Sequence, residues 1–362
     1  MKRILIFAFV AFVAMAGCQT QTAPAPVAPP PEAAAPPAPT EAPIDPALLG
    51  AFAALPAVIE SADNPLTDEK VALGRTLYYD KRFSKNHDLS CNSCHLLTQY
   101  GVDNKATSPG HKGQLGDRNS PTVYNAAGEF VQFWDGRAPT VEEQAKGPVL
   151  NPVEMALADD KAVLAVINSI PEYVEAFKKA FPADKDPVTY DNFGRAIGAF
   201  ERKLVTPSKW DKFVGGDMAA LNDAEKAGFK KFVEVGCTAC HTGALLGGHM
   251  FQKLGLVKPW PNDKDPGRAK VTNSDADKLF FKVPMLRNIE KTGPYYHDGS
   301  VATLEGAVKL MGEHQLGKTL SDADVASIMT FLKTLTGELP TNLIAEPPMP
   351  PSTDKTPKPD PA

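Results

Sequence analysis

Three stretches of the 362-residue chain have hydrophobic patterns that predict secondary structure. An unbroken apolar run from Ile4 to Ala16 follows the basic residues Lys2 and Arg3. Its thirteen residues are too few for a membrane-spanning helix, which needs about 20. Residues 321–335 carry an apolar stripe at helical spacing and predict an amphipathic helix. Residues 140–145 (TVEEQA) predict a helix on the protein surface.

The first 17 residues are typical of a secretory signal peptide, with a basic start and a short apolar centre. The sequence Met-Ala-Gly-Cys that ends at Cys18 resembles a bacterial lipobox. It predicts that Cys18 becomes the lipidated first residue of the mature protein. An ordinary cleavage site with an incidental cysteine is the alternative. Several acyl chains would anchor the protein stably, and Gln19 favours the outer membrane.

Proline is concentrated in two segments that lack any hydrophobic period. Residues 18–46 are rich in proline and alanine and predict a semi-rigid linker after the lipidated cysteine. Residues 346–362 have a similar composition and predict a disordered tail. The remaining residues 47–345 are numerous enough for two domains of ordinary size.

The composition narrows the class of protein. A hydrophobic fraction of 43% with 22% charged residues excludes a disordered chain and a polytopic membrane protein. A net charge of −5 provides no basic surface for nucleic acid. Five cysteines are too few for a disulfide scaffold, so their spacing must explain them.

Four of the five cysteines belong to two copies of the motif C-x-x-C-H, CNSCH at residues 91–95 and CTACH at residues 237–241. In this motif the two thiols bind the haem vinyl groups, and the histidine becomes an axial ligand of the iron. A thioredoxin-type dithiol or a zinc site is the alternative, but neither requires the histidine. The motifs therefore predict two covalently bound c-type haems, attached through Cys91, Cys94, Cys237 and Cys240, with His95 and His241 as iron ligands.

An internal repeat extends beyond the haem motifs. Eight residues align with eight others at a constant offset of 163 without a gap, and seven of these pairs are identical. The exception is Trp134, which aligns with His297. The repeat predicts a duplicated module and a mainly α fold of two cytochrome c-like domains, at residues 47–205 and 206–345. The first copy contains Pro121, Asn125, Trp134, Asp135, Gly136, Thr140, Glu142 and Lys146.

The two modules differ in their candidates for the second iron ligand. Cytochromes c commonly use a methionine that precedes the C-terminal helix, and Met311 has that position in the second module. Met329 lies within the predicted helix and is expected in the core. The residue that aligns with Met311 in the first module is Pro148, which has no sulfur. Since methionine ligation raises the reduction potential, the two haems should differ in potential.

Eight motifs occur in a fixed order over residues 48–345: CNSCH, GHKGQLGDRNSPTVYN, FWDGRA, GPVLNPVEM, CTACH, VPMLRN, GPYYHDG and AVKLMG. In these motifs the chain resembles the bacterial di-haem cytochrome c peroxidases. The resemblance implies a periplasmic enzyme that reduces hydrogen peroxide to water with electrons from small c-type cytochromes or cupredoxins. It also implies a homodimer with calcium between the domains.

The resemblance also implies roles for individual residues. His95 and His111 would ligate the peroxidatic haem in the resting oxidised enzyme, and His241 and Met311 the electron-transferring haem. Trp134 would bridge the haems. The peroxide pocket would be lined by Gln144 and Glu154, and calcium would be bound by Asn119 and the backbone carbonyls of Thr292 and Pro294.

Other interpretations of these residues and of the whole chain stay open. His111 lies in a glycine-flanked loop, where a histidine is usually only solvated, and Trp134 could be a core residue. Residues 151–154 (NPVE) also have the pattern of a helix start, with Glu154 closing a capping box. The chain could be an electron-transfer cytochrome. It could also be a di-haem oxidase that modifies a partner protein, but that branch replaces the sulfur ligand with tyrosine, and Met311 argues against it.

Overall fold

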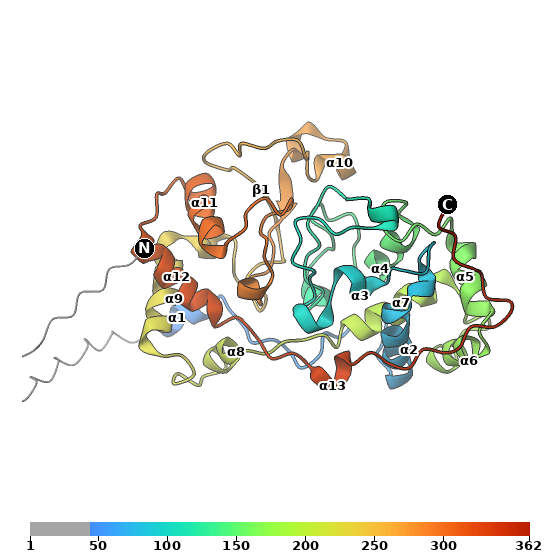
Figure 1. The fold of residues 1–362 in the computed structure, drawn as a ribbon. Coiled ribbons are helices and arrows are strands. Elements are labelled where there is room, and N and C mark those ends of the chain that lie inside the picture. The colour runs from blue at the N-terminus through green and yellow to red at the C-terminus, as the bar shows by residue number, and fades with distance from the viewer. Residues whose placement is uncertain (1–43) are drawn as a thin grey trace, which may run out of the picture. The chain divides into compact units, whose positions relative to one another are not determined.

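The computed structural model describes residues 44–362, so the signal peptide, Cys18 and nearly all of the linker lie outside the described residues. Within this range the buried apolar side chains form two large clusters, which define an N-terminal and a C-terminal module. Figure 1 shows the helices of both modules. The elements are mainly α-helices, as predicted, and none of the described helices is long and apolar enough to cross a membrane. The helices are α1 (Pro46–Leu49), α2 (Asp68–Tyr79), α3 (Cys91–Cys94), α4 (Val141–Leu150), α5 (Asp160–Asn168), α6 (Pro171–Ala180), α7 (Tyr190–Glu201), α8 (Lys209–Val214), α9 (Asp223–Val235), α10 (Ala269–Thr272), α11 (Leu304–Leu316), α12 (Asp322–Lys333) and α13 (Thr341–Ile344). The strands β1 (Phe251–Lys253) and β2 (Phe280–Lys282) form an antiparallel pair in which Phe251 is opposite Lys282.

Each module is built on a pair of crossing helices that approach closely at a glycine. In the N-terminal module α2 packs on α7, and a Cβ added to Gly74 would lie 1.8 Å from the carbonyl oxygen of Ala196. In the C-terminal module α9 packs on α12, and a Cβ added to Gly228 would lie 2.3 Å from the carbonyl oxygen of Ser327. Only glycine allows backbones to approach this closely.

The helix predicted at residues 321–335 is confirmed as α12. The hydroxyl of Ser321 accepts a hydrogen bond from the peptide N–H of Asp324 and caps the helix N-terminus. Met329 lies on the partly buried side and packs against the C-terminal core, as expected. The helix predicted at residues 140–145 is the start of α4, with Thr140 as its N-cap, but it is not a surface helix, because Val141, Glu142 and Ala145 are buried.

The predicted repeat is present in the backbone as well as in the sequence. Asn125 and Asn288, which are 163 residues apart, both have the left-handed φ of 61°. Their side-chain amides donate hydrogen bonds to the same acceptor, the hydroxyl of Thr206, at 2.8 and 2.9 Å. Thr140 and Thr303, another identical pair of the repeat, cap α4 and α11. The two copies therefore meet around Thr206, at the start of the second module.

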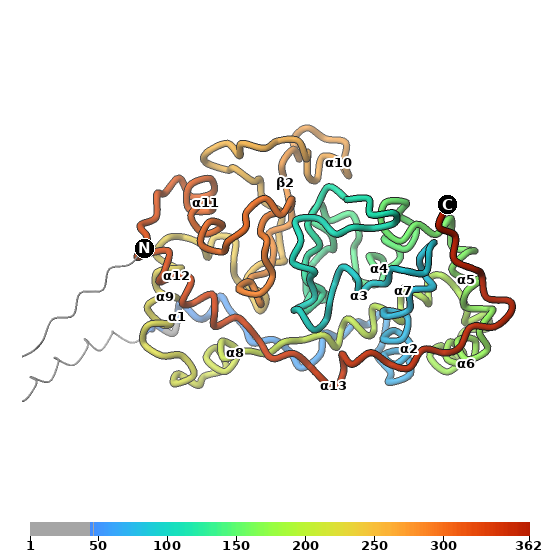
Figure 2. The backbone as a smooth tube through the Cα atoms, in the orientation of Figure 1, coloured from blue at the N-terminus to red at the C-terminus, as the bar shows by residue number. Residues whose placement is uncertain are grey.

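The start of the described chain packs on the C-terminal module, and its end packs on the N-terminal module. The predicted domain boundaries at residues 47 and 345 therefore need correction. Figure 2 shows α1 beside α9 of the C-terminal module. Ile44 and α1 pack in the C-terminal core, and the ring of Phe52 lies 5.4 Å from that of Trp210. Conversely, Ile344 of α13 is buried in the N-terminal core. Sequence order predicted contiguous domains, whereas burial of these apolar side chains decides the exchange.

The C-terminal tail also differs from its prediction, because residues 346–362 are ordered against the N-terminal module. They run past α13 toward α6 and α5 (Figures 1 and 2). Thr356 is 4% exposed, and its hydroxyl accepts a hydrogen bond from Ser169 Oγ at 3.0 Å. The proline-rich composition correctly excludes helix and strand, but side-chain hydrogen bonds fix the extended chain.

Candidate haem sites and the cavity at Glu154

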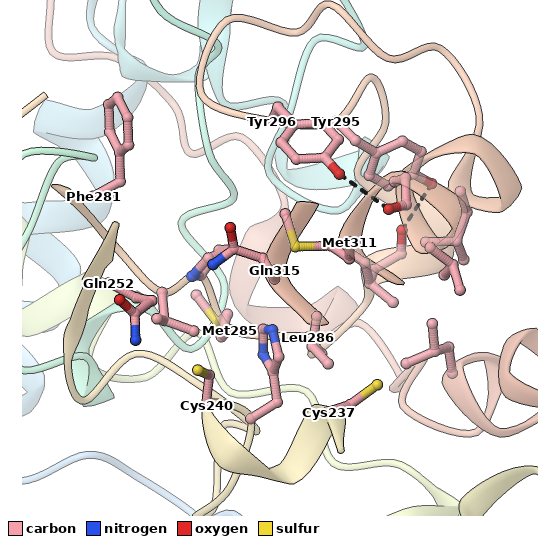
Figure 3. A pocket seen from close by; sticks show the side chains of 18 of the residues that line it. Cys237, Cys240, Gln252, Phe281, Met285, Leu286, Tyr295, Tyr296, Met311 and Gln315 are labelled. Carbon is pink, nitrogen blue, oxygen red and sulfur yellow. Dashed lines mark hydrogen bonds between the residues drawn. The ribbon is translucent and has the colours of Figure 1, made fainter. Parts of the chain in front are cut away.

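The second C-x-x-C-H motif lies at one end of a cavity of about 250 Å³ in the C-terminal module. Cys237, Cys240 and His241 line this cavity, and Met311 of α11 faces them from the other side (Figure 3). Two thiols, an imidazole and a thioether thus meet in one mainly apolar space, which is the donor set that a c-type haem with His/Met ligation needs. A second sulfur, that of Met285, lines the same cavity and was not singled out from the sequence.

The ring of His241 is held in the orientation of an iron ligand. Its Nδ1 lies 2.9 Å from the carbonyl oxygen of Leu246. Because a carbonyl can only accept, Nδ1 carries the proton and Nε2 keeps its lone pair. Burial lowers the pKa of His241 to about 4, so the imidazole stays neutral at physiological pH, as metal binding requires.

The first motif has the same local design in the N-terminal module. Cys91 and Cys94 form α3, and His95 follows as its C-cap. His95 Nδ1 lies 3.4 Å from the carbonyl oxygen of Gly101, while the hydroxyl of Tyr78 donates to the carbonyl oxygen of His95 at 2.7 Å. His95 can therefore present Nε2 to an iron in the way that His241 does.

The thiols of both motifs have the properties of haem attachment sites rather than of a redox dithiol. Cys91, Cys94, Cys237 and Cys240 are not joined in disulfides. Burial raises the pKa of the Cys237 thiol to about 11 and also raises that of Cys94. A thioredoxin-type pair depends on a lowered pKa, so the surroundings argue against that alternative.

In the N-terminal module, Pro148, the residue that aligns with Met311, lines a different cavity. Pro148, near the end of α4, lines a cavity of about 280 Å³ together with Glu154 and Asn151. Phe133 and Arg137 line it from the preceding loop. Where the C-terminal module offers a sulfur ligand, the N-terminal module has open space beside a carboxyl group.

The helix start predicted at Asn151 is wrong. Asn151 is the C-cap of α4, and its Oδ1 accepts a hydrogen bond from the peptide N–H of Val153 at 3.1 Å. This is a side-chain turn, which asparagine forms as readily as an N-cap. The next helix, α5, begins only at Asp160, so the carboxyl of Glu154 closes no capping box and lines the cavity instead.

The electrostatic surroundings of Glu154 suit a group that exchanges protons. Burial raises its pKa, and the charge of Arg137 and a hydrogen bond with Asn151 act in the opposite direction. The guanidinium of Arg137 lies 3.4 Å from the centre of the Phe133 ring. Arg137 was not singled out from the sequence. The repeat could have indicated it, since the aligned residue in the other module is Ser300 and the two copies therefore differ at this position.

His111 is buried and is tied to Glu154 through the backbone, rather than solvated in a free loop. Its peptide N–H donates to the carbonyl oxygen of Glu154 at 2.7 Å. A Cβ on the preceding residue, Gly110, would lie 1.9 Å from the carbonyl oxygen of Val153. The loop therefore presses against the turn that carries Glu154, and Gly110 is needed for that contact.

Trp134 belongs to the first copy of the repeat, but its side chain lies at the cavity of the second module. It lines the cavity of Met311 and packs partly buried against the C-terminal core. Its indole N–H donates to the backbone carbonyl of Asn119 at 2.9 Å. A bridging position is therefore compatible with its contacts, whereas burial in the core of its own module is not observed.

The three residues of the predicted calcium site all line the cavity of Met311. The side-chain nitrogen of Asn119 donates to the carbonyl oxygen of Lys105 at 2.9 Å. Its side-chain oxygen has no hydrogen bond to any of residues 44–362 and is free to bind a cation. With the carbonyls of Thr292 and Pro294, this oxygen gives the ligand type that calcium prefers.

Gln144 is the one predicted catalytic residue that lines neither cavity. It is half-buried on α4, between Glu143 and Gly147, which do line the Glu154 cavity. By helical spacing Gln144 lies one turn before Pro148 on α4.

Comparisons with known proteins agree on one family. The family profile described as "Di-haem cytochrome c peroxidase" matches residues 68–219. The cytochrome c551 peroxidase of Nitrosomonas europaea is 48% identical over 300 residues, which cover 82% of this chain and 88% of the relative. That of Pseudomonas aeruginosa is 46% identical over 308 residues, covering 83% and 88%. The crystal structure of a MauG-like protein associated with microbial copper homeostasis aligns with a TM-score of 0.70 at 30% identity, over 81% of this chain and 95% of that one.

Proposed function

Because this chain belongs to the di-haem cytochrome c peroxidase family and is a peroxidase, we propose that it reduces hydrogen peroxide to water in the periplasm, with electrons from a small c-type cytochrome or a cupredoxin. The observation that carries the proposal is the difference between two aligned positions. Met311 faces His241, while Pro148 leaves a cavity at Glu154. Peroxide needs an open position beside a proton-transferring group, and the N-terminal module has a cavity at Glu154 where the other module has the sulfur of Met311.

Glu154 is the acid–base residue of the reaction. When bound, the haem supplies the redox chemistry that splits the peroxide O–O bond. Glu154 takes the proton from the near oxygen of peroxide and delivers it to the far oxygen, which leaves as water. Burial raises the pKa of this carboxyl toward neutral pH. A pKa nearer to neutral favours both the uptake of the proton and its release to the far oxygen. Gln144, one turn before Pro148 on α4, orients the peroxide by hydrogen bonding.

Electrons enter through the C-terminal module, where His241 and Met311 hold one haem, and reach the N-terminal module past Trp134. The indole supports this route because it belongs to the first repeat and lines the cavity of the second. Methionine ligation favours the reduced state of the C-terminal haem. The N-terminal haem, with His95 as its ligand, is the peroxidatic one.

His111 blocks the peroxidatic iron in the resting oxidised enzyme and leaves when the enzyme is reduced. Its neighbours Lys112 and Gly113 both have positive φ, at 57° and 72°, so the loop turns sharply beside the histidine. Its burial and its backbone bond to Glu154 support a resting position on the peroxide side.

Calcium bound by Asn119, Thr292 and Pro294 would hold the two modules together, since these residues come from both repeats. The protein acts as a homodimer, attached to the outer membrane through lipidated Cys18 and the linker up to residue 46. These features rest on the sequence and on the family.

The test is steady-state consumption of hydrogen peroxide with a reduced cytochrome c, started from oxidised and from pre-reduced protein. We expect turnover in both cases, with a lag or a slower start for the oxidised protein. Electron transfer between cytochromes without any loss of peroxide would contradict the proposal and identify an electron-transfer protein.

A further inference from the structure

The C-terminal segment 346–362, here called the strap, has a buried anchor on the N-terminal module. Thr353 Oγ1 donates to the carbonyl oxygen of Ser169 at 2.7 Å, and Ser169 Oγ donates to Thr356 Oγ1 at 3.0 Å. Ser169 ends α5 and is buried, as is Thr356. The strap thus contacts the module through these hydroxyl groups and, closer to its start, through Met349, which packs against the N-terminal core.

Beyond this anchor, backbone hydrogen bonds connect the strap through two further segments to the His111 loop. These segments contain Lys85 and the Glu154–Met155 turn. The peptide N–H of Asp360 donates to the carbonyl oxygen of Lys85 at 2.8 Å. That of Lys85 donates to the carbonyl oxygen of Met155 at 2.8 Å. The adjacent carbonyl, that of Glu154, accepts the peptide N–H of His111 at 2.7 Å. One ladder of hydrogen bonds therefore links the strap to both residues that are proposed to control peroxide access.

The outer end of the strap is held by exposed groups, whereas its anchor is buried, and Lys85 Nζ there donates to the carbonyl oxygen of Ala362 at 2.8 Å. Lys85 Nζ lies 3.5 Å from Asp360 Oδ2, and the two side chains are 34% and 56% exposed. Exposed ion pairs of this kind contribute little. The pKa of Asp360 is lowered by the peptide N–H of Ala362 and less strongly by the charge of Lys85.

We propose that the strap is a positioning element for the His111 loop and acts on it through the backbone of the turn at Glu154 and Met155. When docked, it holds the segment around Lys85 against the Met155–Glu154 turn and thereby keeps the His111 loop closed; when its outer end detaches, the loop opens more easily. An extended chain without helix or strand contacts opens at lower free energy than a packed helix, and this makes such a switch possible. The inference rests on the proposed function and adds the element that sets how firmly the resting state is closed.

Two variants of the holoprotein test the strap. Deletion of residues 352–362 removes both the anchor and the outer end. Thr356→Val keeps the buried shape of the anchor but removes its hydroxyl. Asp354→Ala is the matched control, because Asp354 is exposed within the same segment and has no hydrogen bond or ion pair with any of residues 44–362. The readout is amide hydrogen exchange in the oxidised protein, in peptides that cover residues 108–116 and 151–157.

We expect exchange in these peptides to accelerate by about tenfold or more in the deletion variant, and by less in Thr356→Val, since each lost hydrogen bond changes an opening equilibrium by up to about that factor. Exchange in α12 and in the Asp354→Ala variant should stay unchanged. The oxidised deletion variant should also react with peroxide faster than the wild type, while turnover after pre-reduction stays the same.

Unchanged exchange in both peptides would overturn the inference, even if the deletion lowers the melting temperature, because the strap would then only add stability. Faster exchange without a faster reaction of the oxidised protein would overturn the link to peroxide access. A wild type that consumes no peroxide even when pre-reduced would contradict the proposed function instead, and the exchange experiment distinguishes the two failures.

Discussion

Helices α4 and α11 occupy the same place in the two copies of the repeat, yet the aligned residues that line their cavities differ in chemical type. Both begin at a capping threonine, Thr140 and Thr303. One presents Pro148 to a cavity that contains a carboxyl group, and the other presents Met311 to a cavity that contains His241. The two modules thus differ at this aligned position, which is a proline in one and a methionine in the other, while the threonine caps of the two helices are retained.

The comparison extends to the residues around each cavity. Arg137 and Phe133 on the peroxide side are replaced by Ser300 and Tyr296 in the other module. Tyr296 uses its hydroxyl to bond the carbonyl oxygen of Ala307 in α11 at 3.1 Å, which steadies the helix that carries Met311. Differences between copies therefore mark function more reliably than the identities, which mark the fold.

The largest expected effect is the loss of turnover in Glu154→Gln. Without the carboxyl, proton transfer to the leaving oxygen fails, and peroxide turnover should fall by about 10²–10⁴-fold. Steady-state assays with a reduced cytochrome c measure this loss. The haem spectra and the melting temperature should stay close to those of the wild type.

Glu143→Gln is the control for that prediction, because Glu143 lines the same cavity but is 45% exposed and paired with Lys146 at 2.6 Å. Its turnover should change little. Equal losses in the two variants would mean that the cavity responds to charge in general, and that Glu154 has no special role.

The second prediction removes the proposed block at the peroxidatic iron. His111→Gly should give a high-spin N-terminal haem in the oxidised protein and should accelerate its reaction with peroxide, without pre-reduction, by about tenfold or more. Electron paramagnetic resonance of the oxidised wild type checks the premise. A predominantly high-spin N-terminal haem in the unaltered protein would show that His111 is not its ligand.

The third prediction concerns a substitution that should make the reduction potentials of the two haems more similar. Met311→His should lower the potential of the C-terminal haem by a sizeable part of the roughly 0.8 V range that axial ligands set, and so narrow the gap between the haems. Potentiometric titration measures both potentials. Met285→Leu removes the other sulfur of the same cavity and should leave the gap intact. If Met285→Leu narrows it instead, the ligand has been misassigned.

The smallest effect concerns the last residues of α7 and α12, which are Glu201 and Lys333. Burial raises the pKa of Glu201 from 4.5 to about 8, whereas Lys333 is exposed. The folded protein therefore holds a proton that the unfolded chain releases, and this contribution to stability is complete below the unfolded pKa and lost as pH rises through the folded one.

Glu201→Gln removes this pH dependence. Its melting temperature relative to the wild type should therefore rise by a few °C between about pH 5 and about pH 9. Thermal unfolding at both pH values measures the difference. Lys333→Gln should show no such trend, and a parallel trend in both variants would refute the assignment to Glu201.

Much of the site could be predicted from the sequence because its chemistry is local. The haem motifs are five consecutive residues, and the alignment of Met311 with Pro148 follows from a repeat without gaps. Helix α12 was predictable from its apolar stripe and its Ser321 cap. The role of residues 151–154 was not, because asparagine followed by proline is compatible with both a helix start and the turn that is observed.

The sequence by itself determined the two haem motifs, the duplicated modules and the mainly helical fold, since each depends on residues that are close together or repeat at a fixed spacing. Only the tertiary structure decided that α1 packs in the C-terminal core and that residues 346–362 lie on the N-terminal module. These contacts join residues far apart in the chain, through burial and hydrogen bonds that no local pattern encodes. The same holds for the bond between His111 and Glu154, which exists only because two loops of the folded chain meet.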